Sequence, residues 1–172
     1  TIPLSQHIGA PCKPCVKIGE MVKRGQKIAM TEAFLHADIH ASVSGKVKKF
    51  ENGAIVIESD GEDAWADGLP IDRNWHAMTK DELLAAVKDA GIVGMGGATF
   101  PAFVKLAPKK PVDVLILNGA ECEPYLTADD RLMREEGDRV AEGARILAKI
   151  LGVKRAVVAI EDNKPEEEVA LP

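Results

Sequence analysis

The sequence Val47-Lys48-Lys49-Phe50-Glu51-Asn52-Gly53-Ala54-Ile55-Val56-Ile57-Glu58 contains the clearest local fold signal in the chain. Two β-prone runs flank Asn52-Gly53, the dipeptide that most strongly favours a two-residue hairpin turn. Further short β-prone runs, separated by turn residues, extend back to residue 12. We therefore expect a small all-β domain, which we place at residues 1–60.

The hydrophobic period changes in the second half of the chain. Thr79-Lys80-Asp81-Glu82 is a capping box, in which the Thr hydroxyl and the Glu carboxylate each satisfy a free amide at a helix start. The helix that it opens is expected to end at Gly91. Acidic and Gly-rich residues without periodicity precede the box, and we interpret residues 61–78 as a linker or crossing segment.

Beyond Gly91 the pattern predicts an α/β arrangement. A strand covered on both faces is expected at 112–117, a long amphipathic helix closed by Gly152 at 131–151, and a second buried strand at 155–160. Gly137 and Gly143 inside that helix weaken its continuity. A further helix is expected to begin at Asn163 and Pro165. The order strand, helix, strand predicts parallel strands in a domain that covers 79–172.

Composition and charge limit the function classes. The chain has 172 residues and a net charge of −5, so no field draws its surface to nucleic acid or to an anionic bilayer. Its apolar runs are far shorter than the roughly 20 residues of a membrane-spanning helix. Three cysteines make no disulfide framework, which favours the cytoplasm. Because the chain starts at Thr1 without Met and stops at Pro172 within a helix opening, we expect it to be part of a longer protein.

A glycine-rich loop stands between the capped helix and the first parallel strand. It reads Gly91-Ile92-Val93-Gly94-Met95-Gly96-Gly97-Ala98-Thr99-Phe100-Pro101, and Lys105 follows. Glycines this dense let main-chain amides approach a phosphate or a flat ring, and the lysine could add a charge. A standard dinucleotide fingerprint needs a strand before the glycines, whereas here a helix precedes them. A plain glycine-rich turn and an anion-binding loop both remain open.

An acidic turn follows the first parallel strand: Asn118-Gly119-Ala120-Glu121-Cys122-Glu123-Pro124-Tyr125. Carboxyl ends of parallel strands are where α/β sheets bind ligands, so these polar groups are placed for recognition. Asn offers both a donor and an acceptor, and Glu accepts from hydroxyl or amide groups. A solvated acidic turn is the alternative.

Together these residues resemble a known family. The run 94–101 with Lys105, followed by 118–124, resembles the flavin-binding loop pair of the NADH-binding flavoprotein subunit of respiratory complex I. With residues 3–12 and 39–45 added, the chain is more closely similar to RnfC, the C subunit of Rnf electron transport complexes. The resemblance covers nearly the whole chain, and its motifs are specific as an ordered set.

The resemblance implies roles on the glycine side of a flavin site. Gly94, Gly96 and Gly97 would cradle FMN and leave room for the nicotinamide. Lys105 would pair with the flavin phosphate, and Phe100 would flank the NADH adenine. These residues would form one wall of a cleft shaped for a planar, reducible ring.

The opposite wall would come from the acidic turn. The resemblance implies that Asn118, Glu121 and Glu123 hold the flavin and the nucleotide, with Glu121 as the catalytic group. We expect no metal site in this part of the chain. The iron–sulfur cysteines and the later nucleotide loop of the family would lie beyond Pro172.

The chain departs from the complex I pattern at three positions. That pattern has Arg in place of Met95, Gly in place of Thr99 and an acidic residue in place of Ala120. Ribityl and nucleotide contacts at these positions therefore cannot be transferred. We expect this stretch on its own to carry half a site and to be inactive.

The first domain resembles biotinyl and lipoyl carriers, which share a flattened β-barrel known as a barrel-sandwich hybrid. In biotinyl carriers the exposed hairpin carries the modified lysine, but here Leu35 stands where the acceptor amine would be. Without that amine no amide to biotin or lipoate can form. We expect a structural or docking role. The predicted fold is therefore a mixed α+β, α/β chain: this barrel, then an incomplete Rossmann-like domain.

The implied function is electron input. The parent would be an FMN- and NADH-binding oxidoreductase subunit, peripheral on the cytoplasmic side of a bacterial membrane. Its complex would couple NADH and ferredoxin to ion transport, with 4Fe-4S clusters in the missing part. Its partners would be the other Rnf subunits and NADH, with ferredoxin reached indirectly and nucleic acid excluded. Two rivals remain: a cobalamin reductase-like flavoprotein of bacterial microcompartments, and a non-catalytic docking module.

Four further residues suggest chemistry that we do not favour. Cys12 and Cys15 have the spacing of a redox dithiol, but they precede a β-rich unit rather than open a helix. His36 and His40 are an even number apart, so a strand would place them on one face. With no third ligand, a polar face is expected there rather than a metal site.

Overall fold

The computed structural model describes residues 1–69, 74–95 and 97–163, and their contacts divide the chain into two units. The first unit contains Thr1–Ala77 and Leu84–Lys105, and the second contains Met78–Leu83 and the chain from Leu106 onward. Contacts thus group the glycine loop with the β strands, whereas the expected boundary at residue 79 groups it with the parallel strands. The expected boundaries at 60 and 79 stay a prediction.

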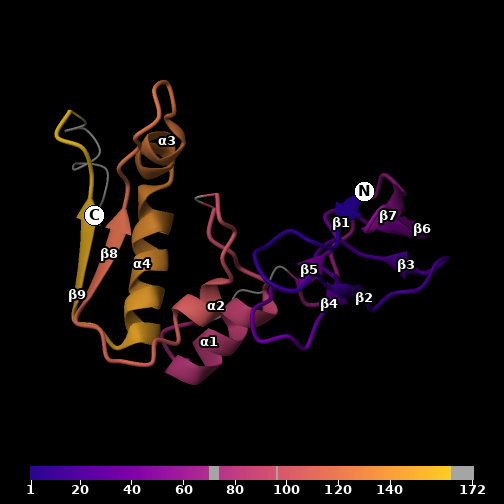
Figure 1. The fold of residues 1–172 in the computed structure, drawn as a ribbon, viewed down its shortest axis with the longest axis horizontal. Helices are drawn as coiled ribbons and strands as arrows, with labels where there is room; N and C mark the ends of the chain where they lie inside the picture. Colours follow the sequence, from indigo (N-terminus) through magenta and orange to yellow (C-terminus); the bar gives the residue numbers. More distant parts are fainter. Residues whose placement is uncertain (70–73, 96, 164–172) are drawn as a thin grey trace. The chain divides into compact units, whose positions relative to one another are not determined.

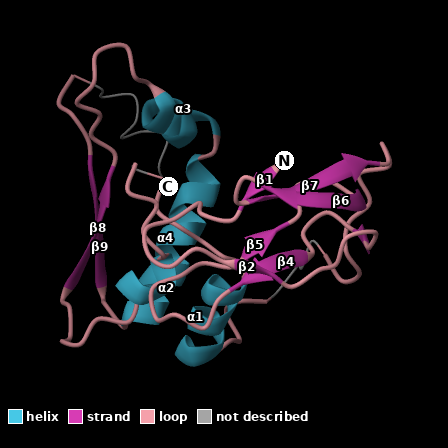
Figure 2. Ribbon diagram, turned by 45° about the vertical axis from the view of Figure 1, so that its right-hand side comes forward, coloured by secondary structure: helices cyan, strands magenta, loops and turns pink. Residues whose placement is uncertain are grey.

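Two small antiparallel sheets form the β part of the first unit. One has the strand order β1-β7-β6-β3, and the other has the order β2-β4-β5 (Figure 2). Their bounds are β1 Ile2–Pro3, β2 Lys13–Pro14, β3 Met21–Val22, β4 Lys27–Met30, β5 Ile39–His40, β6 Gly45–Glu51 and β7 Ala54–Ser59. The expected all-β unit is confirmed over these residues.

The hairpin predicted at Asn52-Gly53 is also confirmed. β6 and β7 pair antiparallel up to Glu51 opposite Ala54. Both turn residues have positive φ, 50° at Asn52 and 69° at Gly53. Positive φ at both positions is what a type I′ turn requires, and the twist of that turn matches the twist of paired strands.

One apolar core lies between these strands. Ile28 of β4, Val47 of β6 and Ile55 of β7 have no exposed surface. The other members are also buried: Ile2, Cys12, Val16, Val22, Ala29, Ile39 and Ala41. Because residues of both sheets contribute, the hydrophobic effect holds the two sheets together.

Part of the expected linker packs on the β strands. The Arg24 amide donates to the Ala64 carbonyl at 2.8 Å, and the Ala66 amide donates to the Arg24 carbonyl at 2.9 Å. The Arg24 guanidinium also lies over the Trp65 ring, 4.5 Å from its centroid. Residues 64–66 therefore run along the edge of the unit. Residues 70–73 lie outside the described part of the chain.

The predicted capping box is confirmed at the start of α1, Lys80–Asp89. The Glu82 carboxylate accepts from the Thr79 amide at 2.7 Å, and the Thr79 hydroxyl accepts from the Glu82 amide at 3.3 Å. Gly91, with φ of 65°, ends the helix as expected. After the glycine loop, Ala102–Lys105 form the short helix α2.

The second unit contains a parallel pair of strands. β8, Val114–Asn118, pairs in parallel with β9, Arg155–Ala159, and α3, Ala128–Glu135, and α4, Gly137–Leu151, connect them. In Figure 1, α4 runs alongside the strand pair. The expected strand, helix, strand order with parallel strands is confirmed. The further helix expected from Pro165 lies outside the described residues.

Three expectations for this unit are wrong. The helix predicted over 131–151 is two helices, because Glu136, with φ of −131°, leaves the helical conformation just before Gly137. Gly143 remains inside α4, so weak helix propensity alone does not place the break. The first strand is not covered on both faces among the described residues, since Val114 is 40% exposed and Ile116 is 64% exposed. The second strand, which was expected to be buried, has no buried residue.

Candidate functional site

The glycine loop has a closed base. Val93 and Pro101 form an isolated antiparallel bridge. The Gly94 amide donates to the Phe100 carbonyl at 2.9 Å, and the Ala102 amide donates to the Ile92 carbonyl at 2.9 Å. These bonds hold the two ends of the loop side by side, so the residues between them project as one turn.

The main chain at the tip of this loop is open. Gly97 has φ of 98°, and a Cβ added there would meet no atom within 4 Å. Met95 next to the tip is almost fully exposed. Glycine is therefore favoured at 97 by backbone conformation and not by crowding, and there is open space on the side where a side chain would stand. Gly94 has an ordinary conformation, and a Cβ added there would make only ordinary van der Waals contact with the Phe100 backbone, 3.8 Å away; Gly96 lies outside the described residues.

Lys105 and Phe100 flank the loop. Lys105 is the last residue of α2, and its exposed ammonium makes no hydrogen bond or ion pair with any described residue. Phe100 is half-buried beside the closing bridge. An open turn of main chain followed by an unpaired cation fits a planar group that carries a phosphate, which is the chemistry of FMN.

The acidic turn begins at the carboxyl end of β8. The Asn118 side-chain oxygen accepts from the Ala120 amide at 3.3 Å, and the Gly119 amide donates to the Ala159 carbonyl at 2.8 Å. Cys122 and Glu123 are exposed. The turn thus extends the pairing of β8 with β9 by one residue and presents Asn118 and Glu123 to solvent.

Glu121 differs from its neighbours because it is buried. Its two carboxylate oxygens accept from the amides of Asp129 at 2.8 Å and Asp130 at 3.3 Å, in the first turn of α3. Thr127 stands at the N-cap of α3 but makes no side-chain cap bond. Glu121 therefore caps α3. The sequence did not reveal this role, because a capping side chain usually stands at the N-cap residue itself, whereas Glu121 lies eight residues before Asp129.

The structure divides the predicted site residues between the two units. Gly94, Gly97, Phe100 and Lys105 lie in the first unit, and Asn118, Glu121 and Glu123 lie in the second. Within each unit the residues share one loop and its flanking element. That both groups enclose one flavin stays a prediction.

The two cysteines of the first unit lie in different environments. Cys12 is buried, and its thiol donates to the Ala37 carbonyl at 3.2 Å, whereas Cys15 is exposed. Burial, followed by nearby charges, raises the pKa of the Cys12 thiol, and burial is also the main cause that raises the pKa of the Cys15 thiol. Among the residues that the structure describes, no three His, Cys, Asp or Glu side chains are grouped to hold a metal.

The expectation that His36 and His40 share a strand face is wrong. His40 ends β5, but His36 precedes the strand and is buried. The His36 ring meets the Phe103 ring edge-on, with centroids 5.6 Å apart. In the segment where a carrier would hold its lysine, Leu35 is half-buried and Phe34 is exposed. Within residues 1–69, 74–95 and 97–163, no helix is both long and apolar enough to cross a bilayer.

Comparisons with known families place the glycine loop and the acidic turn in one segment, unlike the division by contacts. Residues 1–64 match a family model described as the RnfC barrel sandwich hybrid domain, and residues 87–171 match one described as the Nuo51 FMN-binding domain. A barrel-sandwich hybrid followed by an FMN-binding domain is thus supported, while the Rossmann-like detail stays a prediction.

Curated relatives match almost the whole chain. The C subunit of the proton-translocating ferredoxin:NAD(+) oxidoreductase complex of Clostridium ljungdahlii is 55% identical over 96% of this chain and 38% of its own length. The C subunit of the ion-translocating oxidoreductase complex of Rhodobacter capsulatus is 49% identical over 96% of this chain and 34% of its own. The C subunit of the Na(+)-translocating ferredoxin:NAD(+) oxidoreductase complex of Acetobacterium woodii is 45% identical over 99% of this chain and 41% of its own. The chain therefore spans well under half of the length of these relatives.

Proposed function

The chain belongs to the family of C subunits of ion-translocating oxidoreductase complexes, and from that we propose that it forms part of an FMN- and NADH-binding electron-input subunit. The complex would be an Rnf-type ferredoxin:NAD+ oxidoreductase. The subunit would lie peripherally on the cytoplasmic side of the membrane and bind the other subunits of the complex. The names of the relatives and the match to an FMN-binding domain support this proposal.

The chemistry that FMN supplies when bound is the exchange between hydride transfer and single-electron transfer. The residues of this chain would bind and orient it. Open main chain at Gly97 would lie against the ring, and Lys105 would pair with the phosphate. Gly94, Gly96 and Phe100 complete the proposed glycine wall.

On the second unit, Asn118, Glu121 and Glu123 are the proposed contacts to the flavin and NADH, with Glu121 as the catalytic group. Glu121 then has two roles, because its carboxylate also caps α3. The cap would fix the position of the acidic turn. Onward electron transfer is proposed to use 4Fe-4S clusters held by the part of the subunit that this chain does not include.

One observation carries the proposal. The glycine loop bends at Gly97, where an added Cβ would meet no atom within 4 Å, and Lys105, which has no hydrogen-bond or ion-pair partner among the described residues, follows it within the segment that matches an FMN-binding domain. A non-catalytic docking module would need neither feature. The proposal is therefore tested at the lysine.

The test is a titration of the full-length subunit with FMN, read by quenching of flavin fluorescence. Replacing Lys105 with Ala removes one charge-assisted contact to the phosphate, worth roughly 1.5–3 kcal/mol. We expect FMN binding to weaken by at least about tenfold. Lys110→Ala is the matched control, since Lys110 is also exposed and lies five residues further on.

Two outcomes would contradict the proposal. Absence of quenching by the unmodified full-length subunit would favour the docking module. Equal weakening by the Lys105 and Lys110 variants would show a general charge effect rather than a phosphate contact at Lys105.

A further inference from the structure

The glycine loop of the first unit starts directly against the β part of that unit. Gly91 turns the chain off the end of α1, and a Cβ added there would lie 2.2 Å from the Asp38 carbonyl oxygen and 3.4 Å from the His40 ring. Gly91 and Val93 also line, together with Asp38 and His40, a cavity of about 190 Å³. The first residues of the loop are therefore packed on residues 38–40.

Lys27 ties the same two segments together electrostatically. Its ammonium lies 2.7 Å from a carboxylate oxygen of Asp38 and 2.7 Å from one of Asp89. The Asp38 side chain is 8% exposed, whereas that of Asp89, in the last turn of α1, is 71% exposed. Lys27 thus links a buried carboxylate of the β part to the helix end that leads into the glycine loop.

The pKa values in this cluster agree with that link. Burial alone would lower the pKa of the Lys27 ammonium, but hydrogen bonds to Asp38 and Asp89 outweigh burial, and the net shift is upward. The pKa of His40 is lowered, first by burial and then by the Lys27 charge. Lys27 therefore stays charged at neutral pH, beside a neutral His40.

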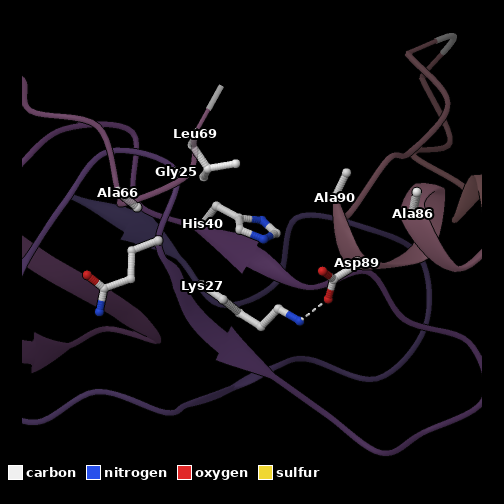
Figure 3. Close-up of a pocket in the computed structure, with 9 residues that line it drawn as sticks. Gly25, Lys27, His40, Ala66, Leu69, Ala86, Asp89 and Ala90 are labelled. Carbon is white, nitrogen blue, oxygen red and sulfur yellow. Dashed lines mark hydrogen bonds and ion pairs between the residues drawn. The ribbon is translucent and has the colours of Figure 1, made fainter. Parts of the chain in front are cut away.

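Figure 3 shows a cavity beside Lys27, with the residues that line it. Lys27 and Asp89 point toward each other and are joined by an ion pair, with His40 beside them. The cavity, of about 660 Å³, is lined otherwise mostly by small or apolar residues, such as Ala86 and Ala90 near the end of α1. Lys27 can thus be replaced by another long side chain without crowding its neighbours.

The far end of the loop is fixed to the same region. Phe103 of α2 meets the His36 ring edge-on, and the Lys88 ammonium lies 5.2 Å from the centroid of the Phe103 ring. Both ends of the loop are therefore attached to residues 36–40 or to the last turn of α1.

We propose that Lys27 is a positioning residue for flavin binding: by bridging Asp38 and Asp89 it presets the glycine loop. The inference rests on the proposed function, because it takes that loop as a flavin contact. With this role for Lys27, the β part of the first unit would do more than dock to a partner. The unit supplies the surface on which the loop is ordered before the ligand arrives, so binding costs less ordering entropy.

The test measures FMN affinity of the full-length subunit by fluorescence quenching, with thermal unfolding recorded for every variant. Lys27→Met removes the bridge, and we expect binding to weaken about tenfold, which corresponds to about 1.4 kcal/mol. Asp89→Ala leaves the buried Lys27–Asp38 pair intact and keeps the test valid if Lys27→Met fails to fold. We expect this variant to weaken binding about threefold.

Three further variants separate positioning from general destabilisation. Lys27→Arg can still reach both carboxylates and should restore binding. The double variant Lys27→Met/Asp89→Ala should bind no more weakly than Lys27→Met, because both changes cut one link. Lys23→Met, which breaks the exposed Lys23–Asp67 pair in the same unit, is the control and should bind as the unmodified subunit does.

The outcomes distinguish the two proposals. If the unmodified full-length subunit does not bind FMN, the proposed function fails, and this inference fails with it. If the unmodified subunit binds FMN and a folded Lys27→Met or Asp89→Ala variant binds equally well, the positioning role alone is overturned. Additive losses in the double variant would also overturn it.

Discussion

The two units bury their apolar strands to different extents. In the β part of the first unit, Ile28 is completely buried between two small sheets. In the second unit, Ile116 of β8 is 64% exposed although it lies in the middle of a strand. Both strands have strongly apolar sequences, so apolar composition alone does not decide how much of a strand is covered.

The difference shows where each unit obtains its stability. The first unit encloses a core to which both of its sheets contribute. Its apolar side chains are therefore covered by one another, and their burial supplies its hydrophobic stabilisation. The second has one helix, α4, beside a two-stranded sheet and leaves Val114 partly and Ile116 largely exposed among the described residues. We therefore expect mutations to act strongly in the first unit and weakly on the open face of the second.

The largest expected effect is at the core of the first unit. Replacing Ile28 with Ala removes a fully buried side chain and leaves a cavity, which costs about 2–5 kcal/mol of unfolding free energy. Both tryptophans, Trp65 and Trp75, belong to the first unit. Urea unfolding of the 172-residue chain, followed by tryptophan fluorescence, measures the effect.

The matched control is Ile116→Ala in β8, the same substitution at an exposed strand position. Its cost should stay within about 0.5 kcal/mol. Helical circular dichroism measures this cost, because α3 and α4 of the second unit contain most of the described helical residues. A cost for Ile116→Ala close to that of Ile28→Ala would show that the face of β8 is covered in solution, and the comparison between the units would fail.

A medium effect is expected at Glu121. Glu121→Gln removes the charge and one of the two oxygens that cap α3, so the second unit should lose about 1 kcal/mol. Glu123→Gln, an exposed neighbour, should change stability little. In the full-length subunit, Glu121→Gln should also slow flavin reduction by NADH, measured by stopped-flow absorbance. Unchanged stability would remove the capping role, and an unchanged reduction rate would remove the proposed catalytic one.

The smallest effects concern one exposed carboxylate in each unit. The Ser44 hydroxyl, which donates to Asp60 at 2.6 Å, is the main cause that lowers the pKa of Asp60 below its ordinary 3.8. In the second unit, the Thr79 amide and then the Thr79 hydroxyl lower the pKa of Glu82 below its ordinary 4.5. A lowered pKa in the folded state stabilises the protein above the unfolded pKa, and the stabilisation is lost as the pH falls through the folded value.

Carboxyl NMR titration between about pH 2 and about pH 6 checks both shifts. Ser44→Ala should raise the pKa of Asp60 clearly and leave that of Glu82 unchanged. Thr79→Ala should raise the pKa of Glu82 only part of the way back to its ordinary 4.5, because the backbone amide that contributes most remains. A full return of the Glu82 pKa to 4.5 would contradict the order of causes.

Features controlled by neighbouring residues could be predicted from the sequence. Asn52-Gly53 predicted the hairpin, and the box at Thr79–Glu82 predicted the start of α1, because each motif satisfies its own hydrogen bonds within a few residues. The helix predicted through Gly137 was wrong. Its apolar period continues across position 136, and periodicity does not register a single residue that leaves the helical conformation.

The sequence indicated which residues are candidates for the site, but not which hydrogen-bond and ion-pair partners those residues have. Composition and place in the chain made the glycine loop and the acidic turn candidate binding elements, with a plain turn open in each case, and the resemblance added their roles at a flavin site, which stay a prediction. The capping role of Glu121 was missed, because its partners lie eight and nine residues away and no local motif marks them. The sequence also held no reason to connect Lys27 with Asp89, which is 62 residues away.

By itself the sequence determined the hairpin turn, the start of α1 and the order strand, helix, strand of the second unit, since those depend on short-range hydrogen bonds and on hydrophobic period. The tertiary structure decided which charges meet and which apolar side chains are covered. Lys27 stands between Asp38 and Asp89 because a strand and a helix end pack together, and Ile116 is exposed because no described element packs on its face. Burial and ion pairing depend on which residues are close in space, and separation along the chain does not predict this.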